Sequence, residues 1–196
     1  MKLLIETERL QIIPFSESYL TLKYIGWLND PEVVRYSEQR HVIHTLETCR
    51  QYLASFAGTS NYFWAITEKN QDTGHIGNIN AYLDTNNSLA DVGIIIGEKK
   101  VWGTGYGSEA WIAVCSFLFE IKQIRKVTAG TTAANKAMVN LMKTSGMVND
   151  GKRLKHYLED GNEVDIIHMA FFSDYWQNSK NIRELKRMYR IRFIEY

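Results

Sequence analysis

Three glycines at alternate positions follow an aliphatic run in the middle of the chain. The run Asp91–Gly97 reads DVGIIIG, and the glycines are Gly103, Gly105 and Gly107, with a helix-like apolar segment after them. A strand that enters a glycine-rich turn at the start of a helix exposes unpaired backbone amides at the positive end of the helix dipole. This arrangement is suited to binding a phosphate group.

Two common phosphate-binding motifs fit this segment poorly. A P-loop ends in Gly-Lys-Ser or Gly-Lys-Thr, but Gly107 is followed directly by Ser108. A dinucleotide fingerprint has glycine at its first, third and sixth positions and an acid about 20 residues later. Here the sixth position is Ser108, and residues 123–126 contain no acid. These motifs are disfavoured, whereas a plain flexible connector before a helix stays open as an alternative.

A third motif matches better. Lys100, Gly103 and Gly105 fit the Gln/Arg-x-x-Gly-x-Gly/Ala signature of the GNAT acyl-CoA N-acyltransferases, with lysine in the basic position. The string Trp102–Ala110, WGTGYGSEA, resembles the branch with ribosomal-protein N-terminal and amino-sugar N-acetyltransferases. A second landmark is Asn135 in TAANKAMVNLMKTSGM, which resembles the family's asparagine-containing helix before Gly-Phe. The chain therefore resembles a GNAT acetyltransferase on two separate landmarks.

The elements that must position these residues follow from periodicity. Residues 9–15 alternate as a strand, residues 16–28 have helical spacing, and Asp30 with Pro31 starts a short helix that ends near Tyr36. Thr45 caps a further helix. The runs 61–69, 74–84 and 89–97 predict three antiparallel strands, with turns at QDTG (71–74) and TNNS (85–88). After the glycines we expect a helix, a strand at 124–130, a helix at 135–145 and a hairpin around Asp160-Gly161.

This order of elements agrees with the resemblance, which implies a mixed α/β (α+β) GNAT fold. Such a fold has a central, mostly antiparallel sheet with a V-shaped cleft between its fourth and fifth strands, flanked by helices. The resemblance also implies acetyl-CoA as co-substrate and no metal. The residues that it assigns to acetyl-CoA are Ile94, Ile95, Ile96, Lys100, Val101, Trp102, Gly103, Thr104, Gly105, Tyr106, Gly107, Ser108 and Asn135.

The reaction implied is attack of a neutral amine on the thioester. Asp91 stands where relatives often have Glu, and it is the candidate general base, with a strand-end surface charge as the alternative. The position at which many relatives carry an acidic Tyr is Met142 here, and Met138 replaces an expected Ser. Protonation of the thiolate is therefore left to water or to another hydroxyl, for which Tyr106 is the candidate.

In this family the first two helices, their connecting loop and the last hairpin form the acceptor site. Residues 27–45 and the turn at Asp160 fill these places here. The candidates that contact the substrate are Trp27, Tyr36, Glu38, Arg40 and His41, which offer aromatic rings, an acid for an ammonium group and bases for an anion. A solvated loop with the same composition is the alternative. The segment WLNDPEV followed by Glu-x-Arg resembles acetyltransferases of nucleotide-linked amino sugars.

Composition limits the partners. The 23 Lys and Arg balance 22 Asp and Glu, so no strong overall field attracts nucleic acid or an anionic membrane. No apolar run approaches 18 residues, and a cytoplasmic location is expected. Cys49 and Cys115 lie on apolar faces of predicted helices and are expected as reduced thiols. His41 and His44 lack a third metal ligand.

The resemblance covers residues 1–176 as one acetyltransferase domain. Residues 177–196 predict a basic amphipathic tail helix, which could pack on the core, form a homodimer or contact an acidic partner. We expect an acetyl-CoA-dependent N-acetyltransferase of a small-molecule amine, an amino sugar or nucleotide-linked amino sugar. The alternatives are acetylation of a protein N-terminus and a non-catalytic acyl-CoA-binding module. A dinucleotide-dependent oxidoreductase is a remote third alternative.

Overall fold

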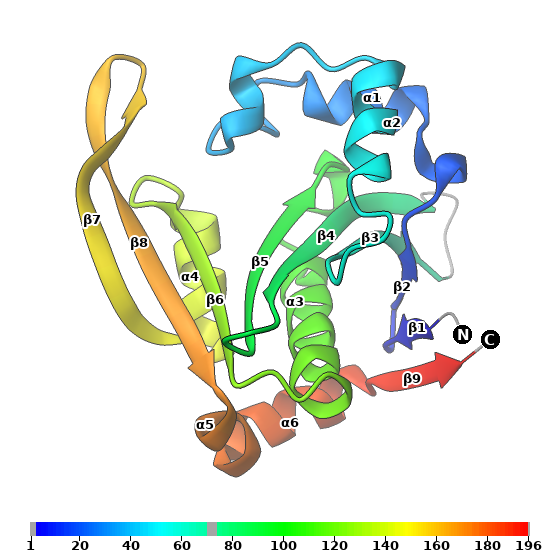
Figure 1. Ribbon diagram of the computed structural model, residues 1–196, viewed down its shortest axis with the longest axis vertical. Coiled ribbons are helices and arrows are strands. Elements are labelled where there is room, and N and C mark those ends of the chain that lie inside the picture. Colours follow the sequence, from blue (N-terminus) through cyan, green and yellow to red (C-terminus); the bar gives the residue numbers. More distant parts are fainter. Residues whose placement is uncertain (1–2, 70–73, 196) are drawn as a thin grey trace.

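The protein is described from a computed structural model, which covers residues 3–69 and 74–195. Within these residues nine strands form one sheet in the order β7-β8-β6-β5-β4-β3-β2-β1-β9 (Figure 1). The strands are β1 (Leu3–Glu6), β2 (Leu10–Pro14), β3 (Tyr62–Glu68), β4 (His75–Asp84), β5 (Leu89–Ile96), β6 (Lys126–Thr132), β7 (Val148–Glu159), β8 (Asn162–Phe172) and β9 (Arg192–Glu195). Neighbouring strands are antiparallel except for the parallel pair β5–β6. The predicted mixed α/β fold with a mostly antiparallel sheet is confirmed.

The parallel pair β5–β6 is short, and its two strands then separate. Their register runs from Leu89↔Lys126 through Ala90↔Val127 to Asp91↔Thr128, although β5 continues to Ile96 and β6 to Thr132. Figure 1 shows the two strands diverging beyond this point. This is the V-shaped opening expected between strands four and five. The numbering is shifted by one because β1 was not predicted.

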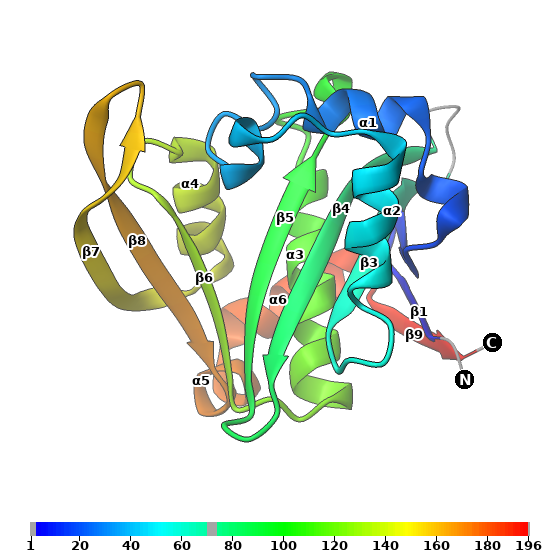
Figure 2. The same ribbon diagram turned by 45° about the horizontal axis from the view of Figure 1, so that its top comes forward.

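Helices cover both faces of the sheet. They are α1 (Leu22–Leu28), α2 (Leu46–Ala54), α3 (Tyr106–Ser116), α4 (Lys136–Ser145), α5 (Ser173–Asn178) and α6 (Lys180–Tyr189), and a π-helical turn η4 (Phe117–Ile121) continues α3. Short 3-10 turns are η1 (Glu17–Tyr19), η2 (Glu38–His41) and η3 (Lys99–Val101). Figures 1 and 2 show α3 and α4 behind the sheet, whereas α1 and α2 lie above its other face.

Side-chain alternation along the central strands separates the core from the opposite face. Ile79 and Ala81 of β4, Ala90 and Val92 of β5, and Val127 and Ala129 of β6 are buried in one core together with α3. The residues between them point to the side of α1 and α2, because successive side chains of a strand point to opposite faces. A smaller apolar cluster, which includes Phe15, Tyr24, Trp27 and Phe63, holds α1 and α2 on that side. This second face is therefore free to carry polar groups.

Two predicted segments differ from the structure. Residues 31–36 form turns rather than a helix, although the Asp30 carboxylate still accepts a hydrogen bond from the Glu32 amide at 2.9 Å. The predicted tail helix is wrong beyond Tyr189, because Arg192–Glu195 is a strand that pairs with β1. α6 packs on the core through buried Ile182. The predicted turn at 71–74 lies outside the described residues except for Gly74.

Candidate active site

The cavity between the polar face of the sheet and α1–α2 is the candidate site. It has a volume of about 1130 Å³. β4, β5, β6 and β8 form its floor, the segment 24–52 forms its roof, and the glycine loop with the start of α4 forms one end. Ten of the thirteen residues predicted to contact acetyl-CoA line this cavity: Ile94, Ile95, Ile96, Val101, Trp102, Gly103, Gly105, Gly107, Ser108 and Asn135.

The glycine loop has the geometry that an anion requires. Gly103 (φ +75°) and Gly105 (φ +88°) both have left-handed backbones, which glycine adopts without strain. Gly105 is the N-cap of α3, and the Glu109 amide makes a bond to its carbonyl at 3.1 Å. The amides of residues 106–108 belong to the first turn of α3, where backbone donors have no partner within the helix. Exposed donors and the helix dipole together make this end of the cavity attractive to phosphate.

A buried ionic cluster beneath α3 fixes the loop. The Glu109 side chain is 1% exposed and accepts hydrogen bonds from the Thr7 hydroxyl (2.6 Å), the Arg9 amide (2.9 Å) and Arg9 Nε (2.6 Å). Arg9 Nη1 also donates to the Thr104 carbonyl at 3.0 Å. The Arg9 side chain therefore ties β2 to the glycine loop.

Lys100, Thr104 and Tyr106 do not line the cavity. Lys100 is an exposed residue of η3, and the Thr104 hydroxyl donates to the Val101 carbonyl at 2.6 Å. The Tyr106 ring is 9% exposed and lies under the Arg9 guanidinium, while its hydroxyl donates to Glu68. Because this contact turns the phenol away from the cavity, the structure does not support Tyr106 as the acid.

The helix α4 presents different side chains to the cavity and to the core. Asn135 caps α4, since its Oδ1 accepts from the Met138 amide (3.1 Å), and its Nδ2 donates to the Thr131 hydroxyl (3.0 Å). Met138 and Leu141 line the cavity, whereas Met142 is fully buried in the core. An acidic side chain at position 142 would therefore require a different packing of α4.

Two of the five predicted acceptor residues line the cavity. Tyr36 and Glu38 do so, although Glu38 also pairs with Arg40 at 2.9 Å. Trp27 is 8% exposed and covers Gly97, where a Cβ atom would lie 2.0 Å from its ring. His41 is exposed outside the cavity lining and lies 3.8 Å from Glu38.

Arg40 ties two walls of the cavity together and does not line it. Its Nη2 donates to the Leu158 carbonyl of β7 at 3.1 Å, and its Nη1 donates to the Ser37 carbonyl at 3.0 Å. The loop before α2 is thereby attached to the last hairpin. The Arg40 guanidinium therefore connects the loop to the hairpin, and it does not face the cavity to bind an acceptor anion.

Asp91 lies where β5 and β6 separate. Its Oδ2 accepts a hydrogen bond from the Thr128 hydroxyl at 2.7 Å. The carboxylate is exposed toward the cavity, yet the surrounding protein removes enough water to raise the pKa of Asp91 above its usual range. The Thr128 hydrogen bond and the charge of nearby His168 oppose that rise in pKa. The His168 imidazole lies over Gly130, where a Cβ atom would be 3.0 Å from the ring.

Sequence reasoning missed a row of polar side chains on β4 and α2. Asn78, Asn80 and Tyr82 line the cavity, and the Tyr82 hydroxyl lies 2.9 Å from that of Tyr52. Burial raises the pKa of Tyr52, so this hydroxyl stays protonated at neutral pH. The signal was present in HIGNINAYLD, because a central strand with polar residues at alternate positions must face something other than apolar core.

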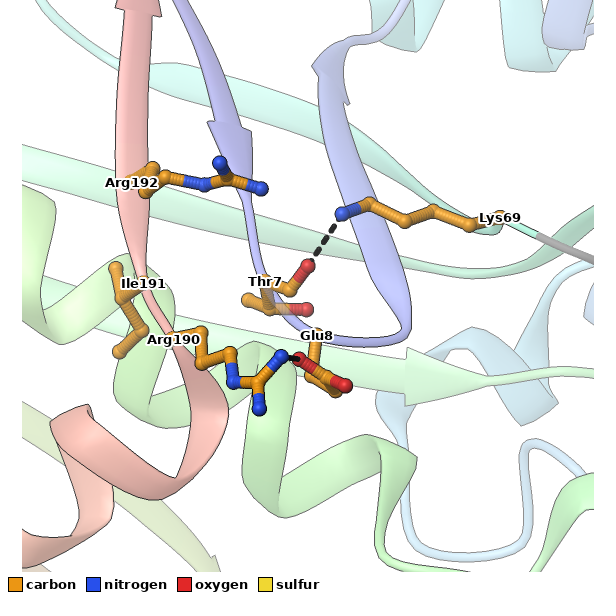
Figure 3. A pocket seen from close by; sticks show the side chains of 6 residues that line it. All are labelled: Thr7, Glu8, Lys69, Arg190, Ile191 and Arg192. Atoms are coloured by element: carbon orange, nitrogen blue, oxygen red, sulfur yellow. Dashed lines mark hydrogen bonds and ion pairs between the residues drawn. The ribbon is translucent and has the colours of Figure 1, made fainter.

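A second, smaller cavity of about 340 Å³ lies between β9 and the β1–β2 turn (Figure 3). Its three basic residues already have acidic partners: Lys69 pairs with Glu6 (2.5 Å), Arg190 with Glu8 (3.1 Å) and Arg192 with Glu6 (3.5 Å). The two arginine pairs attach the C-terminal segment to the N-terminal turn, and the Lys69 pair attaches the end of β3 to β1. We therefore assign the residues of this cavity a structural role and not a role in binding a ligand.

The described part of the chain contains no group of three or more His, Cys, Asp or Glu side chains that could hold a metal ion. Among residues 3–69 and 74–195, no helix is long and apolar enough to cross a bilayer. Cys49 and Cys115 are buried free thiols.

The parallel strands β5 and β6 diverge, and the start of α3 offers an anion site at one end of the cavity. A sequence model described as "Acetyltransferase (GNAT) domain" matches residues 9–148. The chain belongs to the GNAT acetyltransferase family and is an acyltransferase enzyme. GNAT acetyltransferases use acetyl-CoA as the acetyl donor.

Solved structures share the fold at low sequence identity. A GNAT-family acetyltransferase from Bacillus anthracis is 20% identical, with 87% of this chain and 99% of that chain covered and a TM-score of 0.74. Spermidine N-acetyltransferase from Vibrio cholerae, in complex with CoA and spermine, is 15% identical, with 86% of this chain and 98% of that chain covered and a TM-score of 0.77. Ribosomal-protein-S5-alanine acetyltransferase from Vibrio fischeri is 18% identical, with 88% of this chain and 98% of that chain covered and a TM-score of 0.72. No curated protein sequence matches the chain.

Proposed function

We propose that the enzyme transfers the acetyl group of acetyl-CoA to the primary amine of a small molecule, of the amino-sugar class. The observation that carries this proposal is the lining of the acceptor side of the cavity. It combines carboxylates with neutral amides and hydroxyls, and no Lys or Arg of the described chain lines the cavity. Among the carboxylates, Glu32 pairs with Lys99 (2.5 Å) and Glu38 with Arg40 (2.9 Å), which leaves Asp91 as the one without a basic ion-pair partner among the described residues. Carboxylates attract an ammonium group, and amides and hydroxyls bond to sugar hydroxyls.

The absence of Lys and Arg from the described lining bears on the nucleotide-linked alternative. A nucleoside diphosphate carries negative charges that proteins usually bind with Arg, Lys or helix N-termini. The start of α3 is the suitable anion site in this cavity, and we assign it to the pyrophosphate of acetyl-CoA. A free amino sugar therefore fits the acceptor side better than its nucleotide-linked form.

In the proposed reaction the neutral amine attacks the carbonyl carbon of the thioester. The C–N bond forms, the C–S bond breaks, and the sulfur leaves with the electron pair. Asp91 accepts the proton that the nitrogen loses, directly or through water. The thiolate takes its proton from solvent, because the Tyr106 hydroxyl is bonded to Glu68.

The acetyl-CoA arm is proposed to lie between β5 and β6. Ile94, Ile95 and Ile96 would contact it mainly through their backbone groups, as an added strand does. The amides of the glycine loop would receive its pyrophosphate. Asn135 lines the same region, but both polar atoms of its side chain already have partners within the protein.

The test is amine-dependent release of CoA thiol from acetyl-CoA, measured with a thiol reagent. The panel contains glucosamine, a UDP-linked amino sugar, spermidine and an alanine-starting peptide. Fastest turnover of glucosamine is the expected result. Preference for the UDP-linked sugar, spermidine or the peptide would overturn the assignment of substrate class, and silence toward every amine would overturn the proposed function.

A further inference from the structure

Two neighbouring asparagine side chains on β4 stand out in the acceptor half of the cavity. Asn78 pairs with Ile95 of β5, and Asn80 pairs with Gly93. Both lie on the face of the sheet opposite the α3 core, and both line the cavity. They are central strand residues, a position that β-branched and aromatic side chains usually occupy.

The side-chain oxygen of Asn78 is buried without a hydrogen bond. The residue is 7% exposed, and its Oδ1 has no partner among the described residues. Two other asparagines have partners: Asn61 Oδ1 accepts from the Leu83 amide (2.8 Å), and Asn29 bonds to the backbone of His44. An unpaired buried amide oxygen destabilises a fold, so its presence in the lining of a cavity indicates a ligand group that donates a hydrogen bond to it.

The Asn80 side chain occupies space that a glycine leaves open. A Cβ atom at position 93 would lie 2.8 Å from Asn80 Oδ1. Gly93 does not have a positive φ, so its backbone alone does not require glycine. The missing side chain at Gly93 therefore allows the Asn80 amide to lie across β5.

The two amides are close to the reacting end of the cavity. Tyr82 pairs with Asp91, and Asn80 pairs with the residue two positions further along β5. Diagonal neighbours of this kind are about 7–8 Å apart in an antiparallel pair. A molecule of monosaccharide size whose amine meets Asp91 would therefore extend over Asn80 toward Asn78.

Amides and hydroxyls have matching hydrogen-bonding chemistry. A hydroxyl both donates and accepts, so it can donate to the unpartnered Asn78 Oδ1 and also accept from the N–H groups of an amide. An ammonium group only donates, so it can pair with the amide oxygens but leaves the amide N–H groups without an acceptor. We propose that Asn78 and Asn80 bind hydroxyl groups of the acceptor and are specificity-determining residues. This inference rests on the proposed function, because it deepens the assignment to hydroxyl-bearing amines.

The test compares two amines that differ in hydroxyl groups, glucosamine and cyclohexylamine, in the thiol-release assay. The variants are Asn78→Leu and Asn80→Leu, and Asn86→Leu in the exposed β4–β5 turn is the matched control. We follow the ratio of kcat/KM for the two amines, because a change in this ratio cancels their intrinsic difference in reactivity. We expect each cavity variant to lower the ratio about 10- to 100-fold, the range for a lost buried hydrogen bond. The control leaves the ratio unchanged.

Two further readouts separate substrate binding from a structural role. The affinity for acetyl-CoA, measured by calorimetry, should not change in any variant. The melting temperature of Asn78→Leu should stay the same or rise, because an apolar group replaces an unpaired amide of similar size. A large drop in its melting temperature would show a structural amide and would overturn the inference.

The failures are distinguishable. If glucosamine is acetylated and the ratio stays within about twofold of the native value in both cavity variants, the inference is overturned and the proposed function stands. If the native enzyme acetylates other amines but not glucosamine, the inference falls together with the substrate class. If no amine of the panel is acetylated, both proposals fail.

Discussion

Replacing Asp91 by Asn should separate activity from stability. The substitution removes the charge while it keeps the size and an oxygen that can accept the hydrogen bond from Thr128 (2.7 Å). General-base assistance contributes about 10²- to 10⁴-fold. We expect a loss near the lower end, about 100-fold in kcat/KM at pH 7. The reason is that Asp91 is open to the cavity, where water can partly replace the carboxylate.

The loss should shrink as pH rises. An amine with a pKa near 8 is neutral in about a tenth of molecules at pH 7 and in about nine tenths at pH 9. Native Asp91 also takes the proton of a bound ammonium group, so the native rate depends little on the neutral fraction of free amine. The variant depends on that fraction fully, so the ratio of native to variant rates should fall roughly tenfold between these pH values. A ratio that stays constant from about pH 7 to pH 9 would refute Asp91 as the base.

Stability should change in the opposite sense. Because desolvation raises the pKa of Asp91, the folded protein holds the proton more tightly than the unfolded chain does. The stability gained from the neutral form is therefore present at acid pH and is lost as pH rises through the raised pKa. Asp91→Asn removes that loss, so the melting temperature at pH 7 should be equal or higher. Asp174→Asn, an exposed change in α5, is the matched control for both measurements.

Three further outcomes follow from the geometry of the glycine loop. Glu109→Gln should lower the free energy of unfolding by about 2–3 kcal/mol in urea denaturation, because it weakens a buried set of bonds while Arg9 still reaches water. Gly105→Ala should weaken acetyl-CoA binding about tenfold in calorimetry, whereas Gly161→Ala, with a similar positive φ in the hairpin turn, should not. Tyr106→Phe should leave kcat within about twofold at all pH values, because its hydroxyl does not face the cavity.

Each of these outcomes has a clear contrary result. Unchanged unfolding of Glu109→Gln would mean that the cluster with Arg9 does not hold the loop. Equal affinities of Gly105→Ala and the native enzyme for acetyl-CoA would remove the loop from the binding site. A lost basic limb in the pH profile of Tyr106→Phe would restore Tyr106 as a proton donor.

Much of the framework was accessible from the sequence because its signals are local. The strands at 61–69, 74–84 and 89–97 alternate clearly, and the hairpin turn at Asp160-Gly161 has positive φ at both residues. Thr45 caps its helix as predicted, and the predicted helix at 135–145 begins at its N-cap Asn135. In each case a few neighbouring residues decide the conformation.

The acceptor side was harder to predict because contacts far apart in sequence decide it. Arg40 looks like an anion-binding residue, but its partner is the Leu158 carbonyl, 118 residues away. Trp27 is of a type that could form an aromatic wall of the acceptor site, but its ring packs over Gly97, where the missing side chain leaves room for it. Tyr106 is likewise committed to Glu68, 38 residues earlier. No local pattern in the sequence specifies these pairings.

The short β5–β6 pairing explains why both substrates should meet at Asp91. Backbone groups inside a protein need hydrogen-bond partners, and the register between these strands ends at Asp91↔Thr128. Beyond this pair, the facing edge of β5 is available to an extended molecule that carries amides, as the acetyl-CoA arm does. The acceptor amides Asn78 and Asn80 lie on the adjoining strand β4. Asp91 is the last residue of β5 that pairs with β6, so its carboxylate is placed where an arm along β5 and an acceptor over β4 would come together.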